Sequence, residues 1–271
     1  MMGAMDVQEL GEAAREADGV APFNEATLLA IAAGDEPRVH EVEGPAVAVA
    51  FGGAPVELVV APDSRRHGHG AALARALIDA GERRFWAHGD LPQAQGLAAH
   101  LGLAAERTLL VLRVELGDEA PQERVPDGVT LRAYGPDDVD AIVAVNGRAF
   151  ASHPEQGAMD RADFERRAAS AWFDPAGLFV AERDGEVVGF HWTKVEDGVG
   201  EVYVVGVDPD AHGGGIGAAL TARGLRHLHG RGVRVVDLYV EGDNEPALRT
   251  YRRLGFEEHA RDTLYAAPPV S

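Results

Sequence analysis

The chain has 271 residues, of which 46% are hydrophobic and 25% are charged, as in an ordinary globular protein. This length suits two domains with separate cores. The formal net charge of −19 disfavours nucleic acid and anionic membranes as partners, and the lack of cysteine excludes disulfides and thiolate chemistry. Neither a signal peptide nor a run of about 18 apolar residues is evident, so we expect a cytoplasmic protein.

The first half of the chain is expected to begin with helical segments over residues 6–33, and no clear first strand precedes them. Period-two apolar patterns then predict short strands, and glycines mark the turns between elements. In chain order we expect strand 46–51, strand 56–60, a glycine turn, helix 70–80, strand 83–87, helix 92–101 and strand 107–115.

A linker rich in proline and acidic residues, about 117–128, separates this half from a more regular second half. An Asp-Gly pair at 184–185 predicts a hairpin, and Gly255 is suited to end a helix. The expected order is strand 129–134, helix 136–150, helix 161–172, strands 178–183, 186–194 and 201–207, helix 216–230, strand 233–240, helix 246–254 and strand 257–266.

One strand–turn–helix segment occurs twice, at a constant offset of 147 positions. This offset predicts a duplicated domain, which we place at residues 1–117 and 126–271. The glycine turn before each helix exposes backbone N–H groups at a helix N-terminus, which binds anions such as phosphate. The matching pairs are Val60 and Val207, Pro62 and Pro209, Gly68 and Gly215, and Gly70 and Gly217.

Both turns resemble the pyrophosphate loop of the GNAT acetyltransferases, Arg/Gln-x-x-Gly-x-Gly/Ala between a strand and a helix. The order of elements is also similar to that of the GNAT fold. The resemblance covers both halves and implies an α/β protein (an α+β mixed sheet) with two tandem GNAT domains, the first with a degraded beginning. It also implies that acetyl-CoA is the cosubstrate. The second loop departs from the pattern, since His212 replaces the leading arginine that Arg65 supplies in the first.

The resemblance carries the acetyl-CoA contacts onto two sets of residues. Strand residues would pair with the pantetheine amides, and loop residues would hold the pyrophosphate. The first set is Leu58, Val59, Val60, Arg65, Arg66, His67, Gly68, His69 and Gly70. The second is Val205, Gly206, Val207, His212, Gly213, Gly214, Gly215, Ile216, Gly217, Ala218, Asn244, Glu245, Pro246, Ala247, Leu248 and Arg249.

Acetyl transfer to an amine needs a base for the ammonium proton and benefits from an acid for the leaving thiolate. Glu201 begins the strand before the second loop, where many GNAT enzymes have the base, and Tyr251 matches the family's acid. The alternatives are a solvated charge for Glu201 and a core aromatic for Tyr251. Because the repeat has Ala54 and Ala98 at the matching positions, we expect the second half to be the catalytic one.

Several short segments are similar to the mycothiol synthase family, which acetylates the cysteinyl amine of Cys-GlcN-Ins. This resemblance implies that Glu25, Glu155, Lys194, Glu201 and Tyr239 contact that substrate. The segments are Trp86-Ala-His-Gly89, His153-Pro-Glu-Gln-Gly157, Ala171-Trp-Phe-Asp-Pro175, Gly189-Phe-His-Trp-Thr-Lys194, Gly200-Glu-Val-Tyr203, Leu238-Tyr-Val-Glu241 and Arg249-Thr-Tyr251.

Two other functions stay open from the residues alone. One is a tandem GNAT enzyme for another amine, such as a peptide N-terminus or an aminoglycoside, and the other is a non-catalytic acetyl-CoA sensor. The histidines show no metal-ligand spacing with carboxylates, so we expect no metal. We expect a small-molecule substrate, no nucleic-acid or membrane partner, and a monomer.

Overall fold

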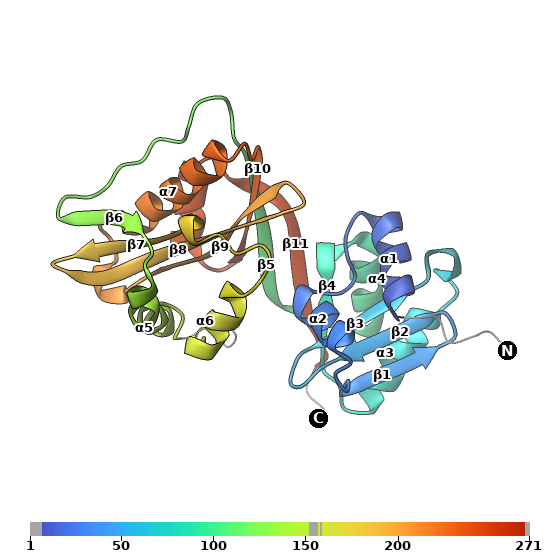
Figure 1. Ribbon diagram of the computed structural model, residues 1–271. Helices are drawn as coiled ribbons and strands as arrows, with labels where there is room; N and C mark the ends of the chain where they lie inside the picture. Colours follow the sequence, from blue (N-terminus) through green and yellow to red (C-terminus); the bar gives the residue numbers. More distant parts are fainter. Residues whose placement is uncertain (1–6, 152–156, 158, 269–271) are drawn as a thin grey trace. The chain divides into compact units, whose positions relative to one another are not determined.

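A computed structural model of the chain describes residues 7–151, 157 and 159–268. Within these ranges, no helix combines the length and apolarity that crossing a membrane requires. The chain forms two compact units (Figure 1). Unit 1 comprises residues 1–110, 241–243 and 260–271, and unit 2 comprises residues 111–240 and 244–259.

Unit 1 is a mixed sheet with helices on both faces. Its strands lie in the order β1-β2-β3-β4-β11, with β3 and β4 parallel and the other neighbours antiparallel. The elements are α1 (Val7–Asp18), α2 (Glu25–Ala33), β1 (Val39–Glu43), β2 (Ala46–Ala50), β3 (Val56–Val60), α3 (His69–Asp79), β4 (Arg84–Ala87), α4 (Pro92–Leu101) and the later part of β11 (Glu257–Ala266).

The fully buried strand β2 explains how both faces of this sheet are covered. Successive side chains of a strand point to opposite faces. Val47 and Val49 pack in one cluster with Leu10 and Ala14 of α1. Ala46, Ala48 and Ala50, which alternate with these valines, pack in a second cluster that includes Leu73 of α3.

Unit 2 repeats this plan. Its strands lie in the order β5-β10-β9-β8-β7-β6, in which β9 and β10 are parallel and β6 to β9 form antiparallel pairs. The elements are residues 111–115 of β5 (Ala104–Glu115), β6 (Val129–Ala133), α5 (Val139–Ala149), α6 (Arg161–Ala168), β7 (Leu178–Arg183), β8 (Glu186–Glu196), β9 (Val199–Val207), α7 (Ile216–Gly230), β10 (Val235–Glu241) and α8 (Glu245–Arg253).

Strand β9 has a β-bulge at Tyr203. Trp192 on β8 lies opposite Val204 and Thr193 lies opposite Val202, so one extra residue stands between the two pairs. The bulge reverses which residues face α7. Before it, the even-numbered residue Gly200 faces this helix, since a Cβ on Gly200 would meet Leu228 of α7. The later even-numbered residues, including Val204, instead pack with α5 and α6.

The structure confirms most of the expected order. All ten elements expected in the second half occur in that order, and residues 7–18 and 25–33 are helical. The mixed α/β fold is confirmed as well. Strand β1 was not predicted, and its exposed residues explain why it lacks an apolar pattern.

The final strands of the two halves do not follow the expected boundaries of 1–117 and 126–271. Thr263 of β11 pairs with Ala87 of β4, so the end of the chain completes the sheet of unit 1. Conversely, residues 111–115 of β5 belong to unit 2, where Arg113 forms a salt bridge with Asp237 of β10. Each half therefore contributes part of its last strand to the other unit.

Candidate active site

The two glycine-rich loops have the same backbone conformation. Each begins with one 3-10 turn, at Pro62–Ser64 and at Pro209–Ala211, and leads into α3 or α7. These two turns, and the starts of the two helices, are related by the offset of 147 that the sequence shows.

Two positions in each loop have left-handed backbone. The φ angles are 67° at Arg66 and 83° at Gly213, then 89° at Gly68 and 82° at Gly215. This conformation suits glycine, so only Arg66 carries a steric cost. The repeated geometry leaves the first N–H groups of each helix at the loop, as an anion site requires.

The leading residue of each loop is fixed to the strand before it. The Nε atom of Arg65 donates to the carbonyl of Val60 at 3.1 Å, and Nε2 of His212 lies 3.0 Å from the carbonyl oxygen of Val207. His212 thus fills the structural role of the missing arginine.

The remaining guanidinium nitrogens of Arg65 are also occupied. They donate to the two carboxylate oxygens of Asp18 at 2.6 and 2.8 Å, so the charge of Arg65 is balanced within unit 1. The arginine therefore braces the loop, which leaves the backbone N–H groups and Arg66 as the candidate anion-binding groups.

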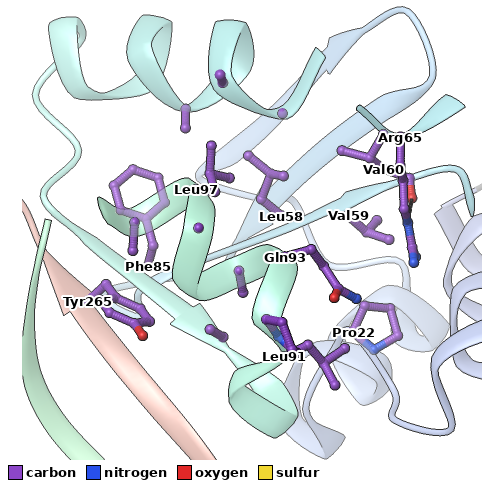
Figure 2. A pocket seen from close by; sticks show the side chains of 18 of the residues that line it. Pro22, Leu58, Val59, Val60, Arg65, Phe85, Leu91, Gln93, Leu97 and Tyr265 are labelled. Carbon is purple, nitrogen blue, oxygen red and sulfur yellow. Dashed lines mark hydrogen bonds between the residues drawn. The ribbon is translucent and has the colours of Figure 1, made fainter. Parts of the chain in front are cut away.

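A cavity of about 480 Å³ lies in unit 1 between the loop and the helices α3 and α4 (Figure 2). This volume is typical of a ligand pocket. Strands β3 and β4 pair at Val56–Phe85 and Glu57–Trp86, after which Leu58–Val60 border the cavity. Of the residues expected to bind the first CoA, all except His67 line it: Leu58, Val59, Val60, Arg65, Arg66, Gly68, His69 and Gly70.

The corresponding strands of unit 2 are arranged in a similar way. Residues 200–202 of β9 pair with β10, and the expected pantetheine-binding residues 205–207 follow them along β9. Gly217 comes close to Val207, as Gly70 does to Val60. Asn244, expected to contact CoA, caps α8 by accepting a hydrogen bond from the backbone N–H of Ala247 at 3.2 Å.

Other residues of the second set stabilise the loop and its helices. Gly213 and Gly214 are exposed, whereas the side chain of Ile216 is buried and anchors the start of α7. Leu248 is buried in α8, and Arg249 forms an ion pair with Glu245 one helical turn earlier.

Glu201 lies directly opposite Lys194, on the neighbouring strand β8. Directly opposed residues share one face of a sheet. The Lys194 side chain is 5% exposed, and its Nζ atom lies 2.9 Å from Glu196 Oε2. The same ammonium lies over the rings of Trp172 and Tyr203, at 5.4 and 5.8 Å from their centroids.

Tyr203 links this cluster to α6. Its hydroxyl accepts a hydrogen bond from Arg167 at 2.5 Å, and its ring packs against Trp172. The rings of Tyr203, the bulged residue, and Trp172 thus lie together beside Lys194, which is paired with Glu201. The sequence did not single out Trp172, Tyr203 or Arg167 individually, although the first two lie in segments that resemble the mycothiol synthase family.

Tyr251 lies on α8 and is buried, with its ring edge-on to Phe256. Burial raises its pKa to about 12, so the phenol stays protonated at neutral pH, as a general acid must. Its backbone carbonyl accepts from the N–H of Phe256, as that of Ala98 accepts from Leu103. This equivalence supports Ala98 as the counterpart of Tyr251.

The other expected substrate residues are spread over several elements. Glu25 is the first residue of α2 and is exposed, and Tyr239 on β10 is 51% exposed. Glu155 lies outside the described residues. Over the described ranges, no group of three or more acidic or histidine side chains has a metal-binding arrangement.

The sequence did not predict a polar cluster of unit 1, which the buried Glu57 forms with the partly buried His88 and Asp262. One signal was present, because Glu57 interrupts the otherwise apolar strand 56–60. His88 also lies in the segment Trp86–Gly89 that resembles the mycothiol synthase family.

Comparison with known proteins agrees with this arrangement. Residues 148–256 match the Acetyltransferase (GNAT) family. Among solved structures, a GCN5-related N-acetyltransferase from Sphaerobacter thermophilus aligns over 97% of this chain and 92% of its own, with a TM-score of 0.70 and 24% identity. A tandem GNAT protein from the clavulanic acid biosynthesis pathway aligns over 83% and 79%, with a TM-score of 0.58 and 22% identity. The fold and the paired loops therefore define a GNAT acetyltransferase, an enzyme that uses acetyl-CoA.

Two similar proteins whose names state an activity identify the family within the GNAT acetyltransferases. The mycothiol acetyltransferase of Thermomonospora curvata is 51% identical over 97% of this chain and 93% of its own length. That of Clavibacter michiganensis is 48% identical over 96% of this chain and 90% of its own. The chain belongs to the mycothiol acetyltransferase family.

Proposed function

We propose that the protein transfers the acetyl group of acetyl-CoA to the cysteinyl amine of Cys-GlcN-Ins, the last step of mycothiol biosynthesis. The observation that carries this proposal is the identity of about 50% with mycothiol acetyltransferases over nearly the whole chain. The arrangement around Glu201 and Lys194 also suits the substrate, because it combines carboxylate, ammonium and aromatic groups on one face of the sheet.

In the proposed reaction, Glu201 removes a proton from the substrate ammonium, directly or through water. The freed amine attacks the thioester carbonyl, and the developing oxyanion accepts a hydrogen bond from the backbone N–H near Val205. The C–S bond then breaks, Tyr251 protonates the leaving thiolate, and the second proton of the attacking nitrogen passes through water to the tyrosinate, which leaves a neutral amide. The place of Tyr251 on α8 supports this role, because it matches the position of the family's general-acid tyrosine.

The polar substrate would be bound by several side chains. Lys194 is suited to donate to sugar hydroxyls, because aromatic rings and Glu196 hold its ammonium in place. We infer that Glu25, Glu155 and Tyr239 add further contacts. The catalytic domain is then the second half, and the repeated loop of the first half serves acetyl-CoA binding alone.

Product analysis tests the proposed substrate. The protein, incubated with acetyl-CoA and Cys-GlcN-Ins, should yield the N-acetylated product by mass spectrometry. Peptide amines and an aminoglycoside, assayed in parallel, should react at least about 100-fold more slowly, since they lack the matched polar contacts. Faster acetylation of a peptide or aminoglycoside would reassign the acceptor, and no product with any amine would indicate an acetyl-CoA sensor.

Calorimetry with CoA tests whether both repeats bind the cofactor. We expect two sites per chain, because both loops have the same anion-binding backbone geometry. Gly70→Val and Gly217→Val form a matched pair, since a side chain at either position approaches the preceding strand. Each variant should retain one site. A single site in the unmodified protein would show that one loop does not bind CoA.

A further inference from the structure

The second glycine loop lacks the positive charges of the first. The offset of 147 pairs Arg65, Arg66 and His67 of the first loop with His212, Gly213 and Gly214 of the second. His212 is already engaged, since its Nε2 atom lies 3.0 Å from the carbonyl oxygen of Val207. The net charge of −19 repels an anionic cofactor, so a phosphate held at this loop requires a positive group supplied locally.

Arg183, the last residue of β7, lies beside this loop. A Cβ placed on Gly214 would come 3.2 Å from its Nη2 atom. Strand pairing fixes the backbone of Arg183, which lies opposite Val129 of β6. Phe179 and Ala181 on the same strand pack against α7. Because alternate residues of a strand share one face, Arg183 lies on the side of the sheet where α7 begins.

Arg183 is half-buried and, within the described parts of the chain, its guanidinium forms no ion pair or hydrogen bond. Other arginines near the two loops are paired. Arg148 reaches the turn before the second loop but forms a salt bridge there with Asp208, at 2.6 Å. In the first repeat, Arg65 is paired with Asp18. Because a guanidinium donates two parallel hydrogen bonds to phosphate oxygens, the unpaired Arg183 is suited to bind a phosphate group at this loop.

The loop also has open space beside Arg183. Leaving aside chain neighbours, a Cβ on Gly213 would meet no heavy atom of the described residues within 4 Å, and a Cβ on Gly214 would meet only Nη2 of Arg183. The two glycines thus leave space that the guanidinium borders. A pyrophosphate in this space would contact the N–H groups at the start of α7 and Arg183 together.

We propose that Arg183 binds the pyrophosphate of acetyl-CoA at the second loop and supplies the positive charge that the loop itself lacks. The proposal rests on the proposed function, because it takes this loop as the acetyl-CoA site of the catalytic half. Arg183 lies on a strand outside the loop, so the loop pattern alone does not include it. It holds the cosubstrate and does not touch the reacting atoms.

Calorimetry with CoA tests the proposal without any reaction. The Gly70→Val background is used, because this change is expected to disable the first loop. In it, Arg183→Gln should raise the Kd of the second site about tenfold, the effect of losing one charge-assisted hydrogen bond. Arg183→Lys should raise it less, because lysine keeps the charge but not the paired donors. An unchanged Kd in Arg183→Gln would overturn the proposal.

Arg234→Gln is the matched control. Arg234 precedes β10, which runs parallel to β9, whereas the loop follows the far end of β9. Its side chain is 60% exposed, so the substitution removes the same charge at the opposite end of the sheet and should leave the Kd for CoA unchanged. A loss equal to that of Arg183→Gln would show a general effect of charge and overturn the proposal.

A rescue variant separates binding from a structural role. Gly213→Arg, combined with Arg183→Gln, should restore most of the lost affinity. Arg66 already occupies the matching left-handed position of the first loop, and a side chain on Gly213 has open space. Recovery would support the proposal, since a purely structural role of Arg183 does not predict it. Should Arg183→Gln not fold, the same comparisons are made with Arg183→Lys.

Fragments of the cosubstrate identify the phosphate. Dephospho-CoA keeps the pyrophosphate but lacks the 3′-phosphate, so Arg183→Gln should weaken its binding as much as that of CoA. A loss confined to CoA would assign Arg183 to the 3′-phosphate and overturn the proposal. S-acetylpantetheine has no pyrophosphate, and its kcat/KM as acetyl donor should be the same in the wild type and in Arg183→Gln. If the wild type acetylates no amine, the proposed function fails, whereas the calorimetry still tests Arg183.

Discussion

Glu201→Gln is expected to lower kcat/KM for the acceptor about 10²–10⁴-fold, the range that a general base contributes. Gln keeps the shape of the side chain but cannot accept the ammonium proton. The substitution changes only the side chain and keeps the backbone pairing of Glu201 with Lys194, so it should leave the sheet intact. The loss should therefore appear in kcat, with little change in the KM for acetyl-CoA.

The matched control for Glu201 is Glu186→Gln. Glu186 is an exposed carboxylate on β8, at the end of the strand far from Lys194. Its removal changes the net charge by the same amount and should alter kcat/KM less than about twofold. If Glu201→Gln retained near-wild-type kcat/KM, another group would have to remove the ammonium proton.

Tyr251→Phe is expected to lower kcat by about 10²-fold or more, because the departing thiolate would lose its proton donor. The phenol is buried with a pKa of about 12, so it stays protonated over the accessible pH range. The ratio of wild-type to variant kcat should therefore stay constant from about pH 6 to about pH 10. Stopped assays across this range would measure it.

Tyr134→Phe is the control for the loss of a hydroxyl group. Tyr134 packs beside Phe164 in unit 2 and is not among the residues proposed to bind or react. Equal losses in the two variants would point to a general effect on folding. A wild-type rate in Tyr251→Phe would show that the Tyr251 side chain serves only to pack the core, as the buried side chain of its counterpart Ala98 does in α4.

The sequence was informative where the chemistry is local. An anion-binding turn is a short run of residues with fixed backbone geometry, so its two copies were evident as a repeat at 147 positions, and the φ angles match at the same offset. The candidate roles of Glu201 and Tyr251 depended on family resemblance and on their absence from the repeat. They stay predictions.

Features that join distant parts of the chain were not predictable. His88 meets Glu57 across 31 positions and Asp262 across 174, and no local pattern connects them. The bulge at Tyr203 was equally hidden, because an extra residue in one strand is defined only by its partner strand. The pairing of β11 with β4 likewise depends on hydrogen bonds between residues far apart in sequence.

The pairing of β11 with β4 has a consequence for folding during synthesis. Domains usually fold from the N-terminus as the chain emerges from the ribosome. Here residues 1–110 lack the strand that covers β4 until residues 260–266 have been made. Until then β4 would be an unprotected edge, which is prone to pair with other chains. A nascent chain stopped at the linker would therefore be an aggregation-prone fragment, although it contains every residue of the first repeat.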